Sequence, residues 1–198
     1  MRNLKLWLWA LATVGGLSLG QAVEAGPIVG SEALGGAGTT IAGSTDVTTA
    51  TSVSWTAFTD QGTKTGDFTA VPDFEVINGS STLELQVGAP VVAWTFGSAS
   101  WGTFTETSIA AITIGANAIT VYVQGTFVPG TDFDGSITGN TATMVLQMNQ
   151  AGGAGNSVST AATLTTPALT IPEPTSIALF GSMIGLVGLG LIRRNRRS

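Results

Sequence analysis

Short segments in which apolar and polar residues alternate constrain the fold of this chain more than any other feature. Eight such segments lie at residues 52–59, 82–87, 91–96, 101–105, 112–114, 118–123, 142–148 and 157–164. A period of two residues places successive side chains on opposite faces of a strand. Threonine, whose β-branched side chain favours strands, supplies 28 of the 146 residues from 26 to 171.

These segments predict the fold class. Glycine and asparagine residues separate them, and no segment between the two termini has a helical period. We therefore expect an all-β fold, an antiparallel β-sandwich over residues 51–165, with a jelly roll or a barrel as the alternatives. The Gly-, Ala- and Thr-rich residues 26–50 are expected to form a loose N-terminal segment.

The N-terminus has the pattern of a secretory signal peptide. Arg2 and Lys5 precede an apolar stretch that reaches Leu19, and small residues lie before Gly26. We expect a signal helix within residues 1–25 and cleavage between Ala25 and Gly26. Cleavage after Ala22 and an uncleaved membrane anchor are the alternatives.

The C-terminus has the pattern of a membrane span. Residues 176–192 form an uncharged run of 17 residues, which as a helix would be about 25 Å long. Four arginines follow, and by the positive-inside rule they hold this end in the cytoplasm. Pro172, Glu173 and Pro174 lie just before the run, in a linker at residues 166–175. The basic residues of the tail, 193–198, are Arg193, Arg194, Arg196 and Arg197.

This tail resembles the PEP-CTERM sorting signal of Gram-negative bacteria, in which a Pro-Glu-Pro motif precedes a terminal helix and a basic cluster. The resemblance covers only residues 172–198. It implies that the secretion machinery exports the protein and that the membrane protease exosortase then processes it. The protein would pass through the inner membrane and reach the cell surface or extracellular matrix. Such systems are associated with exopolysaccharide, which the resemblance makes a candidate partner.

Charge and composition exclude several classes of function. Residues 26–171 hold one basic residue, Lys64, and ten acidic residues, a formal charge of −9. Such a charge repels the phosphate backbone, so nucleic-acid binding is excluded. The chain has no histidine and no cysteine. Ser-His-Asp and Cys-His catalysis and His-based zinc sites are therefore excluded, and we expect no enzyme.

Three sets of residues remain as candidates for chemistry. Asp132 and Asp134 place two carboxylates beside Gly135, and Ca²⁺ would be the cofactor that suits such oxygen ligands. A solvated Asp-Gly turn is the alternative. Glu84 and Glu106 could pair as a glycosidase acid and base, but each is expected to be a solvated, outward-facing strand residue. Trp101, between Ser100 and Gly102, is expected to be the most exposed tryptophan and a candidate ligand contact.

Together these features predict an exported cell-surface or matrix protein with a structural or adhesive role in an exopolysaccharide matrix. The alternative is a carbohydrate-binding module or a weak carboxylate-based glycoside hydrolase.

Overall fold

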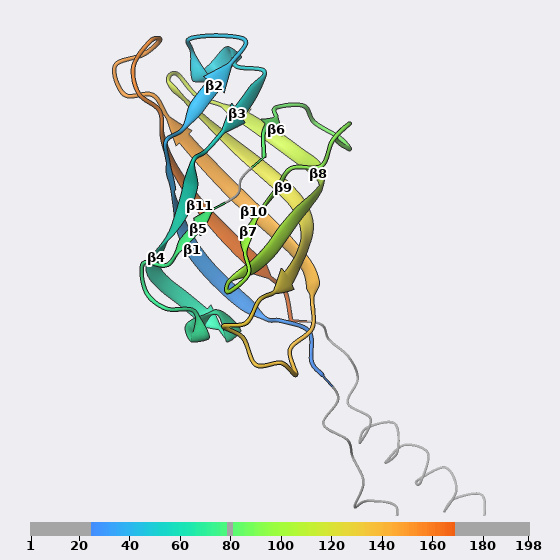
Figure 1. Ribbon diagram of the computed structural model, residues 1–198. Helices are drawn as coiled ribbons and strands as arrows, with labels where there is room; N and C mark the ends of the chain where they lie inside the picture. The colour runs from blue at the N-terminus through green and yellow to red at the C-terminus, as the bar shows by residue number, and fades with distance from the viewer. Residues whose placement is uncertain (1–24, 79–80, 169–198) are drawn as a thin grey trace, which may run out of the picture. The chain divides into compact units, whose positions relative to one another are not determined.

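The computed structural model describes residues 25–78 and 81–168, which form an all-β unit (Figure 1). The predicted fold class is therefore confirmed at this level. Most of the predicted signal peptide and all of the Pro-Glu-Pro motif, the apolar run and the arginine tail lie outside the described residues. Within the described ranges, no helix has both the length and the apolar character to cross a membrane.

One large antiparallel sheet contains most of the strands. In spatial order its eight strands are β5 (Val76–Asn78), β4 (Ala57–Gly66), β1 (Gly30–Ala37), β11 (Ser159–Thr166), β10 (Asn140–Asn149), β9 (Ala118–Pro129), β8 (Gly102–Ile114) and β7 (Thr95–Ser98). A smaller sheet contains β2 (Thr40–Ala42), β3 (Ser52–Ser54) and β6 (Leu83–Glu84). Two short 3-10 helices, η1 (Val47–Thr49) and η2 (Asp67–Ala70), lie between strands.

The large sheet curls until its edge strands β5 and β7 approach each other (Figure 1). Irregularities in strand register contribute to this curvature, because a β-bulge bends its strand and increases the local twist. One separates Glu32 from Leu34 in β1, and two lie in β8, at Glu106/Ser108 and Ile109/Ala111. The architecture therefore lies between the predicted sandwich and the barrel alternative. The large sheet nearly closes on itself, as in a barrel, and the small sheet is a separate second sheet, as in a sandwich.

The concave side of the large sheet holds an aromatic core. Its fully buried rings include Phe58, Trp94, Phe96, Phe104 and Phe127. Ring centroids lie 4.9 Å apart for Phe58 and Phe96, and 5.0 Å apart for Trp94 and Phe96. Burial of aromatic and aliphatic side chains is the main stabilising contribution, as expected for a chain without disulfides.

Several expectations about local structure are wrong. Residues 91–94 precede β7, and the segments 101–105 and 112–114 belong largely to the single strand β8. Residues 26–50 are not a loose segment, because β1 lies in the interior of the large sheet and pairs with both β11 and β4. Its small residues have little strand propensity, so pairing on both sides rather than local preference makes it a strand. Residues 52–59 do not form one strand, because β3 belongs to the small sheet and β4 to the large one.

Candidate functional site

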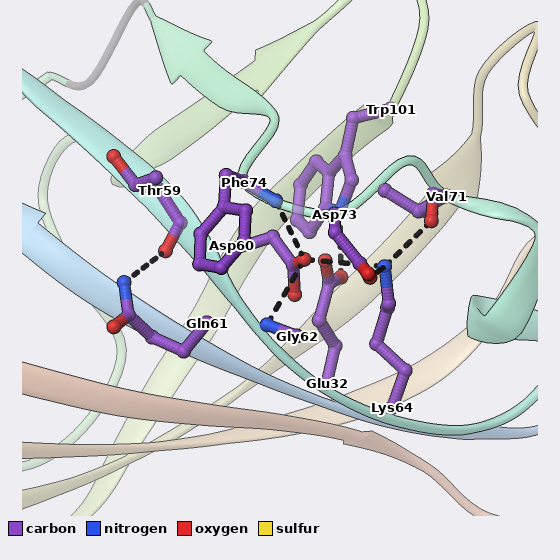
Figure 2. A network of polar contacts seen from close by, with 10 residues as sticks. All are labelled: Glu32, Thr59, Asp60, Gln61, Gly62, Lys64, Val71, Asp73, Phe74 and Trp101. Carbon is purple, nitrogen blue, oxygen red and sulfur yellow. Dashed lines mark hydrogen bonds and ion pairs between the residues drawn. The ribbon is translucent and has the colours of Figure 1, made fainter.

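Two buried carboxyl groups lie on neighbouring strands of the large sheet (Figure 2). Glu32 comes from β1 and Asp60 from β4, beside the register irregularity between those strands. Asp60 Oδ2 accepts hydrogen bonds from the backbone N–H of Gly62 at 3.1 Å and of Phe74 at 3.2 Å. Both side chains are fully buried, so each requires compensation from the groups around it.

Lys64 supplies the compensating positive charge. Its Nζ lies 3.1 Å from Asp60 Oδ2 and 2.7 Å from Asp73 Oδ1, and it donates a 2.6 Å hydrogen bond to Val71 O. The Lys64 side chain is 6% exposed, whereas that of Asp73 is 68% exposed. Burial alone would lower the pKa of Lys64, but its bonds to Asp73 and Asp60 outweigh this effect and raise the pKa.

Trp101 completes the cluster. Its Nε1 donates a 2.7 Å hydrogen bond to Glu32 Oε2, as Figure 2 shows. The expectation that Trp101 is exposed is therefore wrong, because its side chain is 0% exposed. Gly102, with φ of +117°, turns the chain at the start of β8 and breaks the alternation that would otherwise place Trp101 outward. A ligand at the protein surface cannot contact this buried indole.

Burial decides the protonation state of Glu32. The pKa of Glu32 is raised to about 8, first by desolvation and further by the charge and the hydrogen bond of Asp60. The hydrogen bond from Trp101 and the charge of Lys64 oppose this shift. At neutral pH Glu32 is therefore protonated. The cluster can hold a proton in the core, but no substrate can contact its two buried carboxyl groups.

A second carboxyl pair joins the residue before β5 to the loop after β9. The carboxyl groups are those of Glu75 and Asp132, and burial and Glu75 together raise the pKa of Asp132. Glu75 Oε1 accepts hydrogen bonds from Ser98 Oγ, at 3.4 Å, and from Ser100 Oγ. Sequence reasoning missed this pair, because Glu75 and Asp132 are far apart in the chain.

The structure gives Asp132 and Asp134 different surroundings. Asp134 is exposed, and its Oδ1 accepts a 2.9 Å hydrogen bond from the backbone N–H of Ser136, which lowers the pKa of Asp134. Within residues 25–78 and 81–168, no three His, Cys, Asp or Glu side chains gather as a metal-binding group. Calcium binding by Asp132 and Asp134 stays a prediction, which calorimetric titration with Ca²⁺ tests.

Glu84 and Glu106 differ in exposure. Glu84 is exposed as expected, but the expectation that Glu106 is solvated is wrong, because its side chain is buried. Its Oε2 accepts a 3.0 Å hydrogen bond from the backbone N–H of Trp94. Burial raises the pKa of Glu106, and the charge of Glu84 adds a smaller contribution in the same direction. Glu106 points inward because it lies two residues after Phe104, on the same face of β8.

The outward face of β8–β11 has a different chemistry. Glu106 is the only acidic or basic residue in these four strands, and its side chain points inward. The outward side chains are mainly threonine, serine, glutamine and alanine, and Tyr122 stands among them at 43% exposure. We call this surface the outer face. It carries uncharged hydrogen-bonding groups around one aromatic ring.

No protein-family model, curated protein or solved structure matches this chain.

Proposed function

We propose that this protein is exported and carried to the cell surface or extracellular matrix by its C-terminal sorting signal, where it has a structural or adhesive role in an exopolysaccharide matrix. The role is not catalytic. Its signal helix is removed after Ala25, and its C-terminal apolar run holds it in the inner membrane during transit. Exosortase then recognises Pro172, Glu173 and Pro174 and releases the protein from its membrane helix and arginine tail.

The patterns of the two termini carry the proposed export and sorting. The contrast between the buried acids and the uncharged outer face supports the non-catalytic role. Glu32, Asp60 and Glu106 lie in the core, where they bind indole, ammonium or backbone N–H groups. A general acid or base must reach the proton that it transfers, and these groups cannot reach a surface substrate. The outer face instead offers a broad uncharged surface, which suits contact with a hydrated matrix. Burial of Glu106 also argues against the glycosidase alternative.

Fractionation of the producing cells tests the proposal. The wild-type chain is expected in the matrix fraction, with mass spectrometry showing that Ser198 is absent. A double substitution, Pro172→Ala with Pro174→Ala, is expected to leave the uncut chain in the inner membrane. Pro167→Ala is the control, since Pro167 follows β11 but lies outside the motif, and it should behave as wild type. Matrix protein that retains Ser198 would contradict the proposed processing.

A further inference from the structure

We propose that the outer face around Tyr122 binds a neutral polysaccharide chain, with the tyrosine ring as its stacking platform. This inference rests on the proposed function and names the surface that would make the matrix contact. Tyr122 lies on β9, near the middle of the large sheet, and pairs with Val145 on β10 and Ala111 on β8. Both partners have small side chains, and Tyr122 is 43% exposed.

Neutral hydrogen-bonding side chains surround this ring. Thr120 and Gln124 lie two residues away along β9, on the same face of the strand. Neighbouring strands contribute Thr143 and Gln147, which pair with Gln124 and Thr120. An apolar ring within a set of amide and hydroxyl groups matches the chemistry of a sugar, which has C–H faces and a rim of hydroxyls.

One of these side chains already has a defined orientation. Ser108 Oγ donates a 3.2 Å hydrogen bond to Gln124 Oε1, and the two residues pair across β8 and β9. This bond directs the carbonyl side of the amide toward β8, which leaves the Gln124 amide N–H groups as donors for a ligand. An amide held in this way loses little conformational freedom on binding.

The strand that bears Tyr122 is paired on both sides and packed on the core. Val121 and Val123 on the opposite face of β9 are fully buried in the core, and β9 pairs with a strand on each side. A site on such a strand holds its groups more accurately than a site on a loop. The backbone position of Tyr122 is therefore set by the sheet.

Charge favours a neutral polysaccharide over other occupants. The exported residues carry a formal charge of −9 with one lysine, so an anionic polysaccharide or a nucleic acid would be repelled. A second copy of the chain would carry the same net charge, and sedimentation tests for it as an occupant. A neutral polysaccharide is not repelled by the negative charge, and the outer face supplies hydrogen-bonding groups for its hydroxyls.

Affinity electrophoresis of the full chain, purified in a mild non-ionic detergent, tests this inference. The gels contain laminarin, dextran or hydroxyethyl cellulose as neutral probes and alginate as the anionic one. We expect wild type to be retarded by at least one neutral probe. Tyr122→Ala should weaken that binding by about tenfold or more, and Tyr122→Phe, which keeps the ring, should retain most of it. Val128→Ala is the matched control, because Val128 is exposed on the same strand away from Tyr122.

Several results would overturn the inference. One is that wild-type protein is retarded by alginate alone or by no probe. Another is that wild type and Tyr122→Ala bind equally well. A third is a dimer in sedimentation that Tyr122→Ala abolishes. The last result would assign the face to a second copy of the chain. Fractionation separates this inference from the proposed function: a protein that reaches the matrix but binds no neutral probe refutes only the inference. A protein that binds through Tyr122 but never leaves the inner membrane refutes only the proposed delivery.

Discussion

Trp101 Nε1 donates a 2.7 Å hydrogen bond to Glu32 Oε2, although the two residues are 69 positions apart in the chain. The bond connects the start of β8 to β1 through the aromatic core. It joins a buried indole to a buried carboxyl group, so loss of either partner leaves the other without its bond in an apolar environment.

Trp101→Phe should lower the free energy of unfolding by about 2–4 kcal/mol, because it removes the N–H that Glu32 requires and leaves a small cavity. Trp55→Phe is the matched control, since Trp55 Nε1 donates at 3.0 Å to the neutral hydroxyl of Thr160. The free energy of unfolding of that variant should fall by about 1–2 kcal/mol, because a hydroxyl group without a hydrogen bond destabilises the fold less than a carboxyl group without one. Urea unfolding at pH 6 measures both. An equal or smaller loss for Trp101→Phe would contradict this explanation.

Glu32 should make stability depend on pH. Its pKa rises from an ordinary 4.5 to about 8 in the folded protein. Between pH 4.5 and about pH 8, the folded state therefore keeps a proton on Glu32 that the unfolded chain releases. The free energy of unfolding therefore falls as the pH rises through the interval, by a few kcal/mol in total. Urea unfolding at pH 5, 6.5 and 8 measures the slope.

Glu32→Gln tests the origin of that slope, because an amide imitates the protonated acid and does not ionise. The variant should have a flatter pH profile than wild type and greater stability at pH 8. Asp134→Asn is the control, since Asp134 is exposed and its pKa is lowered, so its titration lies at more acidic pH. An unchanged slope in Glu32→Gln would show that Glu32 does not hold the proton.

Lys64→Met should destabilise the protein by about 3–5 kcal/mol, because it leaves the buried carboxylate of Asp60 without its counter-charge. Asp73→Asn removes the other ion pair of the same lysine, but the Asp73 side chain is 68% exposed. Its loss should therefore stay within about 1 kcal/mol. Urea unfolding at low ionic strength compares the two variants. Similar small losses would show that Lys64 does not neutralise Asp60.

Gly125→Ala should destabilise the protein by about 1–3 kcal/mol through overpacking. A Cβ on Gly125 would lie 2.5 Å from Cζ of the Phe104 ring and even closer to the backbone oxygen of Thr105. Gly135→Ala is the control, because among the described residues its Cβ would meet no heavy atom within 4 Å. That control should change stability by less than about 0.5 kcal/mol. Thermal unfolding measures both, and equal midpoints would contradict the close packing of Phe104 on Gly125.

One error and one omission of the sequence-based predictions were avoidable. Ile119, Val121 and Val123 point inward in β9, so the same alternation already placed Tyr122 outward. Phe104 likewise implied that Glu106, two residues later, points inward. The period was present in both strands. For Glu106 its polar character received more weight than its position, whereas the position of Tyr122 was not considered. The exposed aromatic residue and the buried acid of β8 could therefore have been predicted.

Other features could not be predicted from local pattern. The pairs Glu32–Trp101 and Glu75–Asp132 join residues from distant elements. Their proximity depends on which strands become neighbours, and β1 between β4 and β11 is an arrangement that strand propensity does not specify. The inward turn of Trp101 depends on the positive φ of Gly102, which the sequence permits but does not require.

The sequence alone was sufficient for the all-β class and for most of the strands, because a two-residue period reflects burial of one face along each strand. The net charge of residues 26–171 and the pattern of the two termini are likewise properties of composition and order. The tertiary structure decided which acids are buried, which aromatic ring stays exposed and how the sheet curls. The physical reason is that desolvation and hydrogen bonding at these sites arise from contacts between strands that are distant in the chain, after bulges and glycine turns have set their register.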